Sequence, residues 1–370
     1  MEERQKNILY IIGWPLGPGG HIHSTLNHVK YLINSGYHIF VLAPYGPKYS
    51  EFESVGAKYI KMPKSYFIIV FTLLFLILFK KIDIIHAMDY EALKKSIWTK
   101  LIFNRLFIFT KAGGTFPIYK TPPVDSIIVF SGELYDFYKK TVTKKISLFL
   151  IKERIDVELF KPRATVFNKN KRIVFMAMRL ETQKKGWLEN ILDQIRLEYK
   201  KLTDFQFVFA GSGMLLEYFI QKSCKINETA GIELVRFIGK IDDVNEIVDW
   251  YNSSNVVIGH GRGIIEAMAC NKDVIILGES NELELVTNEN IEEISYYNFS
   301  GRHFRFREIK AGDSLVNCLN KCMSTNNWNS DYVLNNYNAE VGAKKISDIY
   351  KVPKQKRSRI GVLKWLLIRN

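Results

Sequence analysis

One stretch decides the fold of this chain: Ile258–Glu266, with the sequence IGHGRGIIE. The apolar run 255–258 that leads into it is typical of a buried strand, the alternate glycines predict a tight turn, and residues from Ile264 onward predict a short helix. A strand, a glycine-rich turn and a helix N-terminus bring backbone N–H groups and a positive dipole end to one point. We interpret this point as a cradle for phosphate or another anion, with Arg262 inside the turn and Glu266 placed to hydrogen-bond sugar hydroxyls.

The same alternation of strand and helix runs along the chain on both sides of this turn. Strands are predicted at 8–12, 38–43, 58–62, 83–88, 106–110 and 126–130, and again at 172–178, 205–209, 233–238, 255–258 and 274–277, where the series closes. Apolar strands that alternate with helices indicate parallel sheets covered on both faces. The predicted fold is therefore α/β, with two doubly wound, Rossmann-like domains facing across a cleft, and ligands at the carboxyl ends of the strands.

The length of 370 residues favours two domains over one core. The polar stretch 161–171 (KPRATVFNKNK) separates the two series of strands, so we place the domains at 1–160 and 161–350. The basic segment 351–370 follows, with apolar residues on or near one side. It is interpreted either as a disordered tail or as an anchor on a membrane surface.

Composition narrows the class of protein. With 47% apolar and 13% aromatic residues, global disorder is excluded. The net charge of +14 calls for an anionic partner, namely nucleic acid, a membrane surface or a phosphorylated substrate, unless it is a generally solvated basic surface. The four cysteines contain no CxxC pair, which favours a reducing compartment, and no signal-peptide pattern opens the chain. We therefore expect a cytoplasmic protein.

The segment 66–79 (YFIIVFTLLFLILF) is nearly all apolar and ends at Lys80 and Lys81. Its 14 residues fall short of the roughly 20 that a membrane-spanning helix needs. Two interpretations remain open, a buried core helix and a helix that dips into the membrane interface beside basic anchors.

Further candidate residues follow the predicted strands. Gly19 and Gly20 come after the first strand and open a helix, where their backbone could approach a ligand closely. Arg179 and Lys185 flank the loop after the first strand of the second domain. A guanidinium and an ammonium so placed suit a diphosphate, and ordinary surface charge is the alternative.

Taken in order, these motifs resemble those of retaining glycosyltransferases of family four, which have the two-domain GT-B fold. The resemblance covers about residues 7–350 and rests on Gly19-Gly20, 83–87 (DIIHA), 155–162, Arg179-Leu180 with Lys185-Gly186, 211–213 (GSG), and Glu266 with 267–269 and 273–275. It implies an N-terminal acceptor-binding domain and a C-terminal domain that binds a nucleotide sugar.

The resemblance also implies roles for single residues. Arg179 and Lys185 would hold the donor diphosphate and stabilise the leaving group in place of a metal ion, and Glu266 would bind the ribose. The expected catalytic residues are Arg179, Lys185, His86 and Asp89; those expected to bind the donor are Gly19, Gly20, Gly211, Gly259, His260, Gly261, Arg262, Gly263, Ile264 and Glu266. No metal or other cofactor is expected.

Three positions depart from the family pattern, one of them mildly, because Asn271 stands where the family has glycine and asparagine tolerates left-handed backbone angles. The first of the family's paired glutamates falls on Ile258, which alters recognition of the donor sugar, and a second histidine near the reacting sugar falls on Met88. Asp89 could instead accept a hydrogen bond from a donor hydroxyl. His86 is interpreted equally as catalytic and as a satisfied histidine at a strand end.

The sequence thus predicts transfer of a hexose or N-acetylhexosamine from a nucleotide diphosphate sugar, with retention and without a metal. The expected acceptor is a lipid-linked or cell-surface glycan at the inner face of the cell membrane, as in polysaccharide, capsule or lipopolysaccharide assembly. The alternatives are an inactive GT-B scaffold or partner subunit, and a nucleotide-sugar epimerase. Nucleic-acid binding and hydride transfer are disfavoured, because no aromatic-basic module and no GxGxxG spacing occur.

Overall fold

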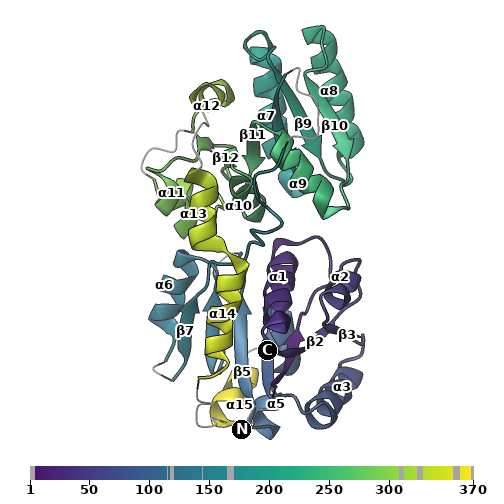
Figure 1. Cartoon of the computed structure of the whole chain (residues 1–370), viewed down its shortest axis with the longest axis vertical. Coiled ribbons are helices and arrows are strands. Elements are labelled where there is room, and N and C mark those ends of the chain that lie inside the picture. The colour runs from purple at the N-terminus through teal and green to yellow at the C-terminus, as the bar shows by residue number, and fades with distance from the viewer. Residues whose placement is uncertain are drawn as a thin grey trace. The chain divides into compact units, whose positions relative to one another are not determined.

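The chain forms two compact units in a computed structural model that describes residues 5–114, 116, 121–143, 145–164, 171–307, 312–322, 328–352 and 359–367 (Figure 1). The first unit comprises Met1–Asp156 and Tyr337–Asn370, and the second comprises Val157–Asn336. The units differ from the expected domains at two points: the first boundary lies four residues earlier, between Asp156 and Val157, and the chain returns to the first unit at Tyr337 instead of staying in the second to residue 350. The cause of this return is α14 (Ala339–Ile349), which packs along α1 (Gly20–Asn34).

The first unit is built on a seven-stranded parallel sheet in the order β3-β2-β1-β4-β5-β6-β7. Its strands are β1 (Asn7–Ile11), β2 (His38–Ala43), β3 (Lys58–Lys61), β4 (Ile84–Ala87), β5 (Leu106–Lys111), β6 (Ser126–Val129) and β7 (Ser147–Leu150). The strand order reverses direction between β1 and β4, which is where such sheets bind ligands. The sequence predicted six of these strands and missed β7.

Helices cover both faces of this sheet, as its doubly apolar strands require. One face packs against α1, α2 (Tyr49–Ser54) and α14. The other packs against α3 (Tyr66–Phe79), α4 (Tyr90–Ser96), α5 (Thr99–Ile102), α6 (Gly132–Thr141) and α15 (Arg359–Leu367).

The C-terminal segment is not a disordered tail where the structure describes it. Residues 359–367 form α15, and Val362 and Trp365 are buried in the same core cluster as the inner side of α3. These two side chains lie three residues apart and therefore share one helix face. Residues 353–358 and 368–370, and most of the predicted linker, lie outside the described residues.

The second unit holds a six-stranded sheet in the order β10-β9-β8-β11-β12-β13. The strands are β8 (Arg172–Ala177), β9 (Phe205–Ala210), β10 (Val235–Gly239), β11 (Val256–Gly259), β12 (Asp273–Leu277) and β13 (Leu283–Leu285). Its helices of more than one turn are α7 (Lys185–Glu198), α8 (Leu216–Ala230), α9 (Val244–Ser253), α10 (Arg262–Ala269), α11 (Ile291–Tyr296), α12 (Leu315–Lys321) and α13 (Trp328–Tyr337), the last running into the first unit. The prediction that 274–277 closes the series is wrong, because β13 adds an antiparallel edge strand.

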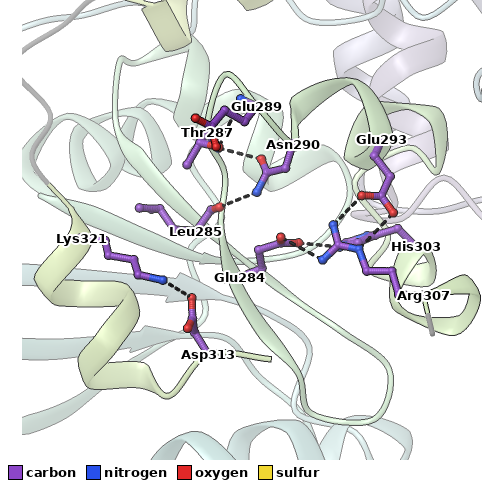
Figure 2. A network of polar contacts seen from close by, with 10 residues as sticks. All are labelled: Glu284, Leu285, Thr287, Glu289, Asn290, Glu293, His303, Arg307, Asp313 and Lys321. Carbon is purple, nitrogen blue, oxygen red and sulfur yellow. Dashed lines mark hydrogen bonds and ion pairs between the residues drawn. The ribbon is translucent and has the colours of Figure 1, made fainter. Parts of the chain in front are cut away.

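A network of ion pairs fastens this edge strand to the segment that follows it (Figure 2). Arg307 contacts Glu293 through two nitrogens and Glu284, on β13, through a third, and the ring of the fully buried His303 lies 2.9 Å from Glu284. Burial alone would raise the pKa of Glu284, but hydrogen bonds from His303 and Arg307 hold it below its ordinary value.

A chain of buried polar groups ties β1, β4, β5 and the end of α14 together in the first unit. The hydroxyls of Tyr10 and Tyr350 are 2.8 Å apart, and the Tyr350 hydroxyl lies 2.9 Å from Nδ1 of His86. Nε2 of His86 lies 2.7 Å from Oγ1 of Thr110. Burial, helped by the charge of His28, lowers the pKa of His86 to about 3, so His86 is neutral in the folded protein.

This buried histidine predicts loss of stability in acid. In the unfolded chain, histidine has a pKa near 6.5, so below that pH the unfolded state binds a proton. The native state does not bind this proton until the pH approaches the pKa of buried His86, about 3. Stability from this group is complete above about pH 6.5 and declines toward pH 3; between pH 7 and pH 5 we expect a loss of about 2 kcal/mol. Urea unfolding at both pH values should show a smaller difference for His86→Gln than for the wild type. An equal difference in the two proteins would contradict the assignment.

None of the described helices is both long and apolar enough to cross a membrane.

Candidate functional site

The strand order of the second unit reverses between β8 and β11, and the predicted site residues gather at the carboxyl ends of these two neighbours. From β8 the chain continues to β9 and β10 on one side, whereas β11 and β12 lie on the other. Loops that leave such adjacent strands in opposite directions open a crevice where ligands bind in this type of fold. The loop after β8 carries Arg179 and leads into α7, and the turn after β11 leads into α10.

The turn between β11 and α10 has the geometry that its glycines predict. Gly261 precedes the first residue of α10 with φ 68° and ψ −138°, a conformation that only glycine adopts readily. Its N–H donates to the carbonyl of Phe299 at 2.5 Å. In the described part of the chain, neither α10 nor α7 has a side chain capping its N-terminus. A helix start without a side-chain cap attracts an anion through its dipole and its amides, but the N–H of Lys185, the first residue of α7, already donates to the carbonyl of Thr182.

Arg262 and Glu266 form a pair on the first turns of α10. Nε of Arg262 donates to Glu266 at 2.6 Å, and their side chains are only 9% and 13% exposed. Burial, followed by the negative charge of Glu266, raises the pKa of the buried Tyr251, which neighbours this pair. This ion pair fixes the orientation of the Glu266 carboxylate on the first turns of α10.

Two cationic side chains, Arg179 and Lys184, precede α7 in the chain, and His260 precedes α10. Arg179 is 62% exposed and lies 3.9 Å from Glu181. Burial and the neighbouring charge of Arg179 lower the pKa of Lys184, against the opposing effect of Glu181. Burial and the charge of Lys184 lower the pKa of His260 to about 4. A lysine and a histidine whose pKa values are lowered by burial and by a neighbouring positive charge are typical of a functional site.

Lys185, which the sequence predicts as the diphosphate ligand, points elsewhere in this structure. Its Nζ lies 3.6 Å from Glu189 and 4.7 Å from the centre of the Tyr218 ring. The sequence analysis missed its neighbour Lys184, and also Trp187, whose ring centre is 4.8 Å from that of His260. The tandem Lys184-Lys185 was the available signal, since Lys184 directly precedes α7 and Lys185 is its first residue.

Gly211 allows a close contact between two backbone segments. A Cβ atom at Gly211 would lie 1.9 Å from the carbonyl oxygen of Met178, and one at Gly213 would lie 2.3 Å from that of Leu180. The N–H of Leu180 donates to Ser212 at 2.9 Å. The 211–213 loop is therefore pressed against the segment that carries Arg179, and its glycines permit this contact.

Two side chains of the decisive stretch face the interior. Ile258 and Ile264 are 1% and 0% exposed, and Ile258 belongs to the core of the second unit. The prediction that Ile264 binds the donor is therefore wrong for its side chain, because that side chain packs over Gly259 and leaves only the backbone amide for a ligand. At Ile258, where the family has a glutamate, the structure offers a buried methyl group and no carboxylate.

In the first unit, the predicted residues lie at the switch between β1 and β4. Gly19 precedes the first residue of α1, which has no side-chain cap. Asp89 caps α4 through the N–H of Ala92 and also accepts the N–H of Gly13, both at 2.8 Å, and burial raises its pKa against these bonds. His86 is completely buried with both ring nitrogens bonded, so the prediction of a catalytic role gives way to the structural alternative.

Among the described residues, no group of three or more His, Cys, Asp or Glu side chains lies where it could hold a metal ion. The expectation that the protein needs no metal stays a prediction.

Comparison with known proteins identifies the fold. No family model and no curated sequence matches the chain. Solved structures do match: a glycosyltransferase from Rickettsia africae at 18% identity and a TM-score of 0.68, covering 94% of this chain and 98% of that one. Anabaena HepE, in complex with UDP and glucose, matches at 14% identity and a TM-score of 0.65, covering 94% and 100%. A candidate UDP-N-acetylglucosamine 2-epimerase from Listeria monocytogenes matches at 12% and 0.61, covering 95% and 99%. The chain therefore has the GT-B fold.

Proposed function

We propose that the protein transfers a hexose or N-acetylhexosamine from a nucleotide diphosphate sugar, with retention of configuration and without a metal ion. One observation carries the proposal. Beside the starts of α7 and α10, which have no side-chain cap, burial and the charge of Arg179 lower the pKa of Lys184, and burial and the charge of Lys184 lower that of His260. Such an arrangement suits a diphosphate, whose negative charge grows as the sugar–phosphate bond breaks.

Each residue has a role in this proposal. The guanidinium of Arg179 binds phosphate oxygens, and Lys184 or Lys185 adds a second positive charge. The amides at the start of α10 contact the phosphate, and Glu266, oriented by Arg262, accepts hydrogen bonds from the ribose. Glu266 and Asp89 are each held by hydrogen bonds within their own unit, so neither is assigned as a nucleophile. Retention then proceeds by attack of the acceptor on the face that the leaving group departs from.

We extend the proposal to the acceptor, a lipid-linked or cell-surface glycan reached at the inner face of the cell membrane. The support is the net charge of +14 together with the apolar helix α3.

Two other functions are compatible with this fold. An inactive GT-B scaffold is favoured by Ile258, because its buried side chain stands where family four has a carboxylate. A nucleotide-sugar epimerase is favoured by the similarity to the Listeria monocytogenes protein. A scaffold binds the nucleotide without releasing sugar, and an epimerase changes the sugar without an acceptor.

Thermal unfolding with UDP, GDP, CDP, ADP and NAD tests the proposal first. We expect one nucleoside diphosphate to raise the melting temperature in the presence of EDTA, because a ligand at a hundred times its Kd adds about 2.7 kcal/mol to stability. The corresponding sugar nucleotides are then incubated with the protein, and sugar release, transfer and epimerisation are followed by NMR. Stabilisation by none of the nucleotides, or by NAD alone, would contradict the proposed function.

A further inference from the structure

The helix α3 presents an apolar face to solvent. Its inner side, Ile69, Leu73, Leu76 and Ile77, packs into the core of the first unit. Its outer side should carry polar residues if solvent were its only neighbour. The outer positions are instead Phe67, Ile68, Phe71, Phe75, Leu78 and Phe79, with exposed fractions from 50% to 71%. We call these six residues the α3 face.

Other exposed apolar side chains lie on helices that cover the same side of the sheet. Ile102 of α5 is 54% exposed, and Ile360, Leu363 and Leu367 of α15 are 69%, 48% and 75% exposed. Helices α5 and α15 contact one another, and α3 and α15 contribute to one core cluster. Figure 1 shows all three helices at the same end of the first unit. Exposed apolar surface of this extent marks an interaction site.

Positive charge accompanies this apolar surface. Lys64 precedes α3, Lys80 and Lys81 follow it, and all three are exposed. On α15, Arg359 and Lys364 are exposed as well. Neither helix contains an acidic residue. The apolar face of the helix suits the acyl chains of an anionic membrane, and the basic residues beside it suit the negative headgroups that lie above those chains.

We propose that the α3 face inserts into the surface of an anionic membrane, with α3 lying in the membrane plane. At 1.5 Å per residue, its 14 residues extend about 21 Å, which suits a helix in the interface better than one across the bilayer. A second copy of the chain is the less favourable occupant. In a two-fold symmetric dimer the same surface meets itself, so the basic flanks of one copy would face those of the other.

The docking surface deepens the acceptor half of the proposed function, but its test uses neither nucleotide nor transfer. The full-length protein is sedimented with vesicles of phosphatidylcholine alone and with vesicles that contain phosphatidylglycerol. We expect binding to the anionic vesicles, reduced by added salt because surface charge is screened. The affinity of the double variant Phe71→Ser/Phe75→Ser for these vesicles should fall by about tenfold or more, because two large apolar side chains no longer enter the membrane.

Two control variants separate the contribution of the apolar α3 face to vesicle binding from that of the neighbouring positive charge. Leu197→Ser changes a side chain of α7 that is 70% exposed in the second unit, and it should bind like the wild type. Lys64→Glu/Lys80→Glu should weaken binding to anionic vesicles while leaving the apolar face intact.

Light scattering of the protein without lipid gives its oligomeric state. No binding to anionic vesicles, or a dimer that Phe71→Ser/Phe75→Ser dissociates without any effect on vesicle binding, would overturn the proposal. If vesicle binding holds but no nucleotide binds, the docking surface stands and the proposed function fails.

Discussion

Replacing Arg179 with alanine is expected to slow sugar transfer by about 10²- to 10³-fold, the usual effect of removing one group that stabilises developing charge. The guanidinium is 62% exposed, and its ion pair with Glu181 is long, at 3.9 Å. Its removal should therefore leave the fold intact. Within the proposal it contacts the departing diphosphate, so kcat should fall more than the affinity for the sugar nucleotide.

The matched control is Arg196→Ala. Arg196 lies on α7, is 53% exposed, and has a similar surface pairing with Asp193 at 3.7 Å. Both variants should melt close to the wild type, and only Arg179→Ala should lose activity. Arg179→Lys should recover part of the loss, because it restores the charge without the two-pronged geometry. If Arg179→Ala and Arg196→Ala have the same kcat, the site has been placed wrongly.

The two adjacent lysines add a comparison within the same assay. Burial and then the positive charge of Arg179 lower the pKa of Lys184, whereas Lys185 lies against Glu189 and Tyr218. We therefore expect Lys184→Ala to weaken diphosphate binding more than Lys185→Ala. The family resemblance assigns Lys185 to the diphosphate and so gives the opposite order. The measurement therefore shows which of the two lysines binds the diphosphate.

The architecture could be predicted because each buried strand is a continuous apolar run. β2 and α3 have the bounds that the sequence predicts, and most other strands agree within two residues. β7 and β13 were missed for a physical reason. They are the last strands at the edges of their sheets, only four and three residues long, and such short segments carry little periodic signal.

The candidate site was predicted less completely, because a pattern does not show where a side chain points. His86 follows the strand motif of the family, yet its ring is enclosed between Tyr350 and Thr110. Tyr350 comes from a helix far along the sequence, and no local pattern indicates that this helix returns to the first unit. Ile264 shows the same limit, since the turn was recognised correctly but the side chain faces the core.

The role of Gly211 could be recognised only once the packing was known, and it leads to the other large expected effect. Gly211→Ala should destabilise the second unit by about 3 kcal/mol, near the upper end for single substitutions. The added Cβ would lie 1.9 Å from the carbonyl oxygen of Met178, which is backbone and cannot rotate away. Relief requires the ends of β8 and β9 to separate. That movement would break the bond from Leu180 to Ser212 and displace Arg179, so nucleotide binding should fall as well.

Gly231→Ala is the control that isolates this clash. Gly231 ends α8 with φ 67°, so alanine there also bears backbone strain, but nothing lies within 4 Å of the added Cβ. Its cost should be that of the left-handed conformation alone, about 1–2 kcal/mol, with nucleotide binding unchanged. Calorimetry and nucleotide titration of both variants separate the two effects. Equal stability and equal nucleotide affinity in the two variants would mean that the contact between the 211–213 loop and the Arg179 segment does not position the site.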